Sequence, residues 1–124
     1  MRFRTLLLIA GLLGIGFGAG FLAAPAPVLS VYGVTTDAAG LFMSRFFGAA
    51  LVELGLVLFL ARGATDRALQ RSIALAGTLG SAVGLGVAVY GQLGGLVNAM
   101  GGSSVAIYGA LLLGYASIFF GQKT

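Results

Sequence analysis

The chain has 124 residues, of which 59% are hydrophobic and only 8% are charged, and its formal net charge is +4. Soluble domains carry about 25% charged residues, so a chain this poor in charge could not cover a water-exposed surface. The composition excludes a soluble enzyme, a nucleic-acid-binding domain and a disordered tail, and it predicts an integral membrane protein with one small domain.

The first long apolar run covers residues 5–24 and carries no charge. A helix needs about 20 residues to cross the hydrocarbon core of a bilayer, and this run has that length. Pro25 and Pro27 end it, because proline disfavours a helical conformation in the residue before it. The basic start resembles a secretory signal peptide, but the apolar run exceeds the usual ~7–15 residues. We therefore expect the segment to be retained as a membrane span.

The segment after this run, residues 25–40, is predicted to be a loop. Its two prolines predict a stiff, extended beginning, and Tyr32 is placed to anchor the loop in the membrane interface. Thr35, Thr36 or Asp37 would cap the N-terminus of the next helix, and the Asp37 carboxylate would also meet a favourable dipole there. The alternative is that Asp37 pairs with Arg45 at the outer mouth of the protein.

Three further apolar runs follow, at residues 41–61, 72–93 and 105–120. Barrel strands would alternate polar and apolar residues over about 10 positions, whereas these runs are continuously apolar and longer. Backbone polar groups in lipid must be satisfied internally, so the runs predict helices. The expected fold is all-α, an integral membrane four-helix bundle that forms a single transmembrane domain over residues 1–124.

The basic residues predict the orientation of the bundle. With four spans, all but one of them fall on the same side of the membrane, and basic loops face the cytoplasm. These residues are Arg2, Arg4, Arg62, Arg67, Arg71 and Lys123. We expect a multi-pass protein of the plasma (inner) membrane with both termini in the cytoplasm.

The 22 glycines predict how the helices pack. Hydrophobicity does not drive helices together within lipid, but small residues spaced by four allow close backbone approach. The predicted packing glycines are Gly14, Gly18, Gly48, Gly80, Gly84 and Gly114. They would serve packing within the chain or, for at least one surplus stripe, dock a second copy or a larger subunit.

Arg45 and Glu53 are the two charged residues inside an apolar run. Each charge near a helix centre costs about 2.5–3.5 kcal/mol on insertion scales, so such residues normally face a bundle interior or a functional site. They lie ~12 Å apart along a helix and do not pair easily. By depth, Tyr115 is an expected neighbour of Glu53, together with the hydroxyls of Thr78, Ser81 and Ser117.

Tyrosines are expected to complete this candidate site for a ligand or coupled ion. Tyr90 and Tyr108 are predicted at the depth of Arg45, and Tyr108 shares a helix face with Tyr115. Three interpretations stay open. In the first, Arg45 extends to the outer interface and Glu53 is protonated and hydrogen-bonded by a hydroxyl. In the second, Glu53 couples transport to a proton or cation. In the third, the pair holds a lipid-like or quinone-like ligand, or an interface with a partner subunit.

Cysteine and histidine are both absent. Their absence removes thiolate nucleophiles, Cys-ligated clusters, the commonest general base and the usual haem ligand. The three acidic residues, Asp37, Glu53 and Asp66, lie in different segments, so a carboxylate metal site is not expected. We expect no metal, no cofactor and no enzymatic activity.

A short pattern carries a family resemblance. A glycine-rich first helix ends at Pro25, a Tyr32-Gly33-Val34 segment and Asp37 follow, and Ser44-Arg45-Phe46-Phe47-Gly48 opens the second helix. In this the chain resembles uncharacterised bacterial four-helix membrane proteins of the DoxX-like and domain-of-unknown-function type. The resemblance implies a small helical bundle and no particular reaction.

These observations lead to one expected function and one alternative. We expect a non-catalytic accessory or structural subunit that acts in the lipid bilayer through helix–helix packing, as a homo-oligomer or within a larger membrane-protein complex, without nucleic acid. The alternative is a small homo-oligomeric proton- or cation-coupled transporter or channel that uses Glu53, with Arg45 at its entrance.

Overall fold

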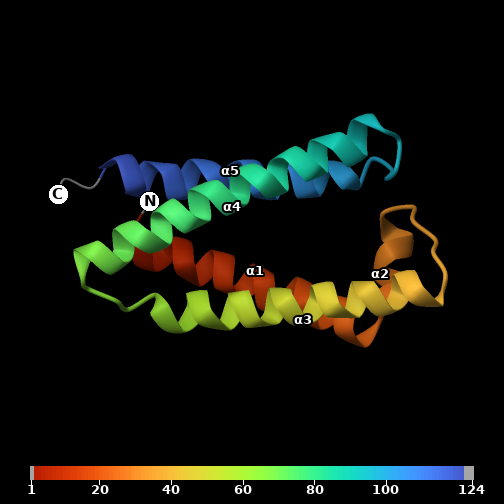
Figure 1. Cartoon of the computed structure of the whole chain (residues 1–124), viewed down its shortest axis with the longest axis horizontal. Coiled ribbons are helices and arrows are strands. Elements are labelled where there is room, and N and C mark those ends of the chain that lie inside the picture. Colours follow the sequence, from red (N-terminus) through yellow and green to blue (C-terminus); the bar gives the residue numbers. More distant parts are fainter. Residues whose placement is uncertain (1, 122–124) are drawn as a thin grey trace. The chain divides into compact units, whose positions relative to one another are not determined.

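The computed structural model describes residues 2–121, which form five helices and no strand (Figure 1). In chain order the helices are α1 (Phe3–Ala23), α2 (Pro25–Val31), α3 (Ala38–Ala61), α4 (Arg67–Leu93) and α5 (Gly101–Gly121). The predicted all-α class is confirmed.

Four of the helices are long and apolar enough to cross a membrane, by their length and composition. They have 21, 24, 27 and 21 residues in α1, α3, α4 and α5. At 1.5 Å per residue even the shortest reaches about 31 Å, which matches the hydrocarbon thickness of a bilayer. By the length and composition of these four helices, the chain is a multi-pass membrane protein.

The helices begin earlier than the apolar runs that predicted them. α4 starts at Arg67 instead of residue 72, and α5 starts at Gly101 instead of residue 105. For α4 the reason is a polar first turn: the Asp66 carboxylate accepts hydrogen bonds from the amides of Ala68 and Leu69, at 2.8 and 3.4 Å. Such capping satisfies amides that have no partner within the helix.

The short helix α2 corrects the prediction of an extended segment after the first span. Pro25 occupies the first turn of α2. Proline fits there because its missing N–H would have no intrahelical partner and its φ angle already suits a helix. The prolines therefore end α1 and start a second helix instead of a stiff strand-like connection.

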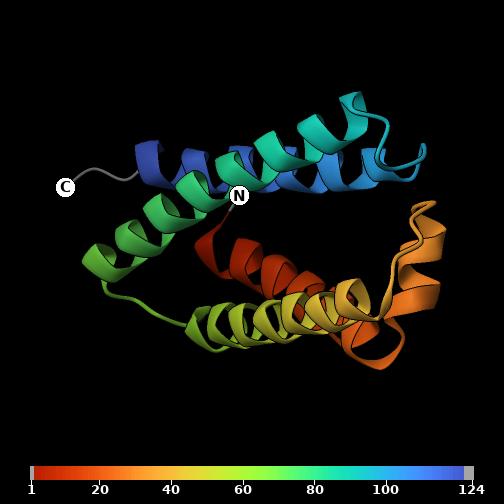
Figure 2. The same cartoon turned by 45° about the vertical axis from the view of Figure 1, so that its right-hand side comes forward.

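The structure divides into two compact units, which are described separately. The N-terminal unit is Leu7–Ala61 and holds most of α1 with α2 and α3. The C-terminal unit is Met1–Leu6 with Arg62–Thr124 and holds α4 and α5. Within each unit two long helices run side by side in opposite directions, as both views show (Figures 1 and 2).

Backbone meets backbone where α1 and α3 pack in the N-terminal unit. A Cβ atom on Gly18 would lie 2.6 Å from the carbonyl oxygen of Gly48, and one on Gly48 would lie 2.7 Å from the carbonyl oxygen of Gly18. Gly11 and Gly55 make the same reciprocal contact, at 2.9 and 2.7 Å between added Cβ and carbonyl oxygen. We call this contact the glycine seam; Gly14, which faces Leu51 and Gly55, belongs to it.

The glycine seam requires glycine because its obstacles are main-chain atoms. Real Cβ atoms essentially never approach other atoms this closely, and a helix carbonyl cannot rotate away as a side chain can. Close approach of this kind also brings Cα–H groups near carbonyl oxygens, a weak attraction common between packed helices. An edge-to-face pair of Phe21 and Phe47, with ring centroids 5.1 Å apart, lies near one end of the seam.

In the C-terminal unit the contact between α4 and α5 is made by tyrosine rings on glycines. A Cβ atom on Gly77 would overlap the Tyr115 ring, and one on Gly84 would overlap the Tyr108 ring. We call these two contacts the tyrosine sockets. Tyr115 is only 4% exposed, so its ring is part of the core of the protein.

The six glycines predicted for helix packing have different surroundings. Gly14, Gly18 and Gly48 lie in the glycine seam, Gly84 forms a tyrosine socket, and Gly114 faces the side chain of Leu6. Gly80 faces open space, with no described atom within 4 Å of its Cβ position. A spacing of four does not predict Gly11, Gly55 and Gly77, because the contacts in both units repeat every seven residues.

Candidate functional site

Two of the three acidic residues have a structural role at helix starts. The Asp37 carboxylate accepts a hydrogen bond from the Gly40 amide at 2.8 Å, within the first turn of α3. Of the three predicted caps of this helix, Asp37 is therefore the one that is confirmed, and Asp66 caps α4 in the same way. Glu53 is the only remaining acidic residue of the chain, and it lies within a membrane span instead of at a helix end.

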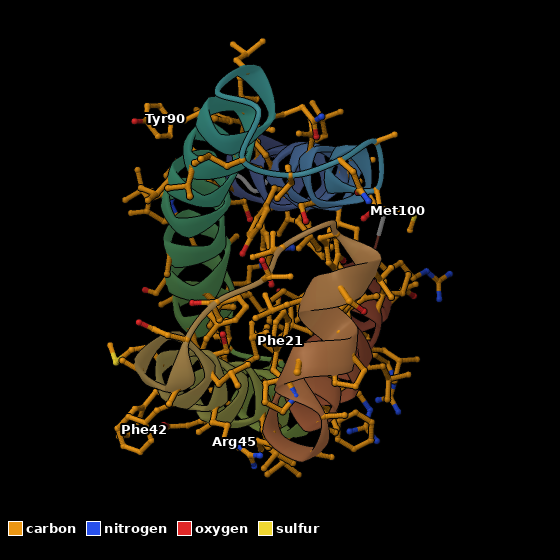
Figure 3. All side chains as sticks on the ribbon, turned by 90° about the vertical axis from the view of Figure 1, so that its right-hand side faces the viewer. Phe21, Phe42, Arg45, Tyr90 and Met100 are labelled. Carbon is orange, nitrogen blue, oxygen red and sulfur yellow. The ribbon has the colours of Figure 1, made fainter. Side chains whose placement is uncertain are left out.

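Arg45 is exposed on α3, and its Nη1 donates a hydrogen bond to the carbonyl oxygen of Leu22 at 2.7 Å. Leu22 stands next to the last residue of α1, where carbonyl groups lack an intrahelical partner. The guanidinium thus binds α3 to the end of α1, and its positive charge suits the negative end of the α1 dipole. Figure 3 shows Arg45 and Phe42 extending outward from the N-terminal unit.

Glu53 is exposed and lies in the centre of an apolar face of α3. At about 100° per residue, it points roughly 145° away from the glycine seam. Residues spaced alternately by three and four share its face, and we call this set the α3 outer face. It consists of Ala39, Phe42, Phe46, Ala49, Glu53, Leu56 and Leu60, all of them exposed.

The Glu53 carboxylate has no hydrogen bond or ion pair within the described part of the N-terminal unit. Arg45 does not reach it, because eight residues of helix separate the two by ~12 Å along the axis. Glu53 also lies about 12 Å from the nearer end of α3, too far for its short side chain to reach the interface. Exposing an unpaired carboxylate to lipid costs free energy. The position of Glu53 at the centre of this apolar face therefore indicates a role other than packing within the N-terminal unit.

Two of the hydroxyls predicted as neighbours of Glu53, those of Thr78 and Ser117, donate within their own helices. Thr78 Oγ1 donates to the carbonyl of Ala74 at 2.7 Å, and Ser117 Oγ donates to the carbonyl of Gly114 at 2.7 Å. Both hydroxyls therefore use their proton on a helix carbonyl, as Ser and Thr commonly do in apolar surroundings.

The three candidate tyrosines do not form one polar group within the C-terminal unit. The Tyr108 and Tyr115 rings share one face of α5, as the seven-residue spacing predicts, but they fill the tyrosine sockets against α4. Tyr90 is 74% exposed on α4 and points outward (Figure 3). The arrangement gives Tyr108 and Tyr115 a packing role and leaves Tyr90 at the surface.

Arg71 mirrors Arg45 in the C-terminal unit and was not singled out in the sequence. Its Nη1 donates to the carbonyl oxygen of Phe119 at 3.0 Å, and its guanidinium carbon lies 4.2 Å from the centroid of the Phe119 ring. Phe119 lies in the last turn of α5, so Arg71 again binds one helix to the end of its neighbour. The sequence alone predicts only a topology role for the Arg71 charge.

No group of three or more acidic, cysteine or histidine side chains within residues 2–121 is arranged to hold a metal ion. Comparisons with protein-family models, curated proteins and solved structures find no match to this chain. The resemblance to DoxX-like proteins stays a prediction from the sequence. The α3 outer face with Glu53 is the candidate functional site, and its chemistry has to be inferred from the residues themselves.

Proposed function

We propose that the protein is a non-catalytic structural or accessory subunit that binds another membrane helix through the α3 outer face. The observation that carries the proposal is Glu53, an exposed carboxylate at the centre of an apolar face, without a polar partner in its own unit. The alternating spacing of three and four along this face is the spacing that lets two helices pack along a seam.

The glycines are a weaker basis for docking than the sequence suggested. Gly14, Gly18 and Gly48 are already used in the glycine seam, so they have no surface left for a partner. The docking surface that we propose is the opposite side of α3. Its large side chains are exposed, among them Phe42, Phe46 and Leu60.

A photo-crosslinking scan of α3 in native membranes tests this proposal. Leu56 and Leu54 are a matched pair, because they are 46% and 53% exposed on the same helix but only Leu56 lies on the α3 outer face. A benzophenone side chain at positions 46, 56 and 60 should give one discrete protein adduct, whereas position 54 should give none. Equal labelling at 54 and 56, or no protein adduct at the outer-face positions, would overturn the proposal.

The alternative of a proton- or cation-coupled transporter relies on the same unpaired carboxylate. A coupling carboxylate must be accessible and free to change its charge state, and Glu53 is exposed. Purified protein in vesicles distinguishes the two functions. Uptake driven by a proton gradient and abolished by Glu53→Gln would favour the transporter, whereas the structural role predicts no such flux.

We further propose that both termini face the cytoplasm in the plasma (inner) membrane. Four spans place both ends on one side, and Arg2, Arg4, Arg62, Arg67 and Arg71 would lie there. Lys123, the sixth basic residue of this argument, lies outside the described residues. Since the chain has no cysteine, single substitutions can be labelled cleanly: a membrane-impermeant maleimide should label Thr35→Cys in intact cells and Thr65→Cys only after lysis.

A further inference from the structure

The charge of Glu53 indicates what its partner must carry. We propose that the α3 outer face binds a transmembrane helix of a different protein, and that this helix presents a lysine or arginine at the depth of Glu53. The inference rests on the proposed function and specifies the chemistry of the partner. A basic residue would neutralise the carboxylate. The same contact would remove the basic side chain from lipid, where its charge is also unfavourable.

Within residues 2–121 the chain offers no cation at the depth of Glu53. Of its seven basic residues, only Arg45 lies well inside a span. The other described basic residues lie in the first two turns of a helix or outside helices; they are Arg2, Arg4, Arg62, Arg67 and Arg71. Lys123 lies outside the described residues. Arg45 in turn lies ~12 Å from the depth of Glu53 and is hydrogen-bonded to Leu22.

The same placement argues against a second copy of the chain as the partner. Two copies in the same orientation would bring Glu53 opposite Glu53, and like charges at close range repel. Their Arg45 residues would again be displaced along the membrane normal from either carboxylate. Only a copy with reversed orientation would bring Arg45 opposite Glu53, and the basic residues predict a single orientation.

The surrounding side chains fit a helix with one basic residue. Ala49 is small and lies next to Glu53 on the α3 outer face, which leaves room for a long lysine or arginine side chain. Phe46 and Leu56 flank the carboxylate on the same face and would cover the apolar stem of that side chain. The face thus provides both the charge and the apolar surface that such a helix needs.

A synthetic peptide tests this chemistry with the full-length protein in lipid vesicles. The probe is a leucine-rich transmembrane peptide with a single central lysine, and the matched peptide has leucine at that position. Energy transfer from a dye on Thr65→Cys to a dye on the peptide reports binding. We expect the lysine peptide to bind about tenfold more tightly than the leucine peptide.

Protein variants show whether Glu53 causes this preference. Glu53→Gln should reduce the preference to less than about twofold, and Glu53→Lys should transfer it to a peptide with a central glutamate. Moving the lysine by eight residues along the peptide should also abolish the preference for the lysine peptide. Leu54→Trp, off the face, should leave the preference intact, whereas Leu56→Trp should weaken binding of both peptides.

Equal binding of the lysine and leucine peptides to the wild-type protein would overturn the inference, and so would a preference that survives Glu53→Gln. If the crosslinking scan labels the α3 outer face while the peptides bind equally, the proposed function stands and the basic partner is wrong. An adduct of twice the mass of the chain would show a second copy on this face and would also overturn the basic partner. If neither experiment shows binding, the proposed function itself fails.

Discussion

The two units have helix–helix contacts of the same spacing that are made by different kinds of atoms. In each unit two antiparallel helices touch at positions seven residues apart, Gly11 and Gly18 on α1 and Tyr108 and Tyr115 on α5. Four residues beyond the second position, an arginine of the neighbouring helix holds a carbonyl near the helix end. The N-terminal unit fills its contact with main chain, whereas the C-terminal unit fills it with aromatic rings.

The difference predicts which unit tolerates change. Within lipid, helices associate by close packing, and both units achieve it with glycines on at least one helix. In the glycine seam an added methyl group meets a carbonyl oxygen, which cannot move without moving the helix. In a tyrosine socket the added methyl group meets an aromatic ring, and the tyrosine side chain can change its rotamer at a modest cost in free energy.

The largest effect should follow from Gly18→Ala in the glycine seam. The new Cβ would lie 2.6 Å from the Gly48 carbonyl oxygen and 2.7 Å from a methyl group of Val52, so α1 and α3 must separate. We expect a loss of about 3 kcal/mol in the free energy of unfolding, the upper end of typical overpacking costs. Reversible unfolding in mixed detergent micelles measures it.

Gly16→Ala is the control for this variant. Gly16 lies on the same helix but faces open space, so its replacement by alanine should be neutral or stabilise the protein by up to about 1 kcal/mol. If both variants lose stability equally, the close approach of the two backbones is not what holds the N-terminal unit together.

A smaller loss is expected for Gly77→Ala in a tyrosine socket. The added methyl group overlaps the Tyr115 ring, which must turn aside, at a cost of about 2 kcal/mol. Tyr115→Leu in the same chain should recover at least about 1 kcal/mol of this loss, because the smaller side chain leaves room for the methyl group. Additive effects of the two substitutions would argue against the socket.

The two arginines give a third comparison. Arg45→Met and Arg71→Met each remove a charged hydrogen bond to a helix-end carbonyl, worth about 1.5 kcal/mol in soluble proteins. Arg71→Met should cost more, because Arg71 also stacks over the Phe119 ring. The same unfolding measurement ranks them, and a larger loss for Arg45→Met would contradict the contribution of stacking.

The helix caps should show the smallest effects. Asp66 accepts hydrogen bonds from two amides and Asp37 from one. Asp66→Ala is therefore expected to cost about 1 kcal/mol and Asp37→Ala about 0.5 kcal/mol. Hydrogen exchange of the first-turn amides of α3 and α4 provides a local readout, and unchanged exchange in the Asp66 variant would contradict its cap.

The sequence predicted well what depends on local composition. Apolar runs of span length gave all four long helices, and Asp37 before the second run gave a cap, because both depend on neighbouring residues alone. The first span ends before Pro25 as predicted, but the extended segment predicted after it is wrong, because a proline that ends one helix can also begin another and the surrounding residues do not decide between them.

The sequence predicted less about contacts between helices. Tyr108 and Tyr115 were correctly placed on one face, but which helix that face meets depends on pairing, and they pack on Gly84 and Gly77. Gly11 and Gly55 were missed for the same reason. A search for glycines seven apart would have found both these and the sockets, since a period of seven keeps two antiparallel helices in contact over several turns.

The glycine seam also has a consequence for the entropy of assembly. A glycine has no side-chain rotamers to lose, so the points of the glycine seam where main chain meets main chain order no side chain of their own. Joining α4 to α5 instead freezes two phenol rings in fixed orientations. The hairpin that leaves the ribosome first is therefore the one whose central contacts fix no phenol ring, and it can form before the second hairpin has been synthesised.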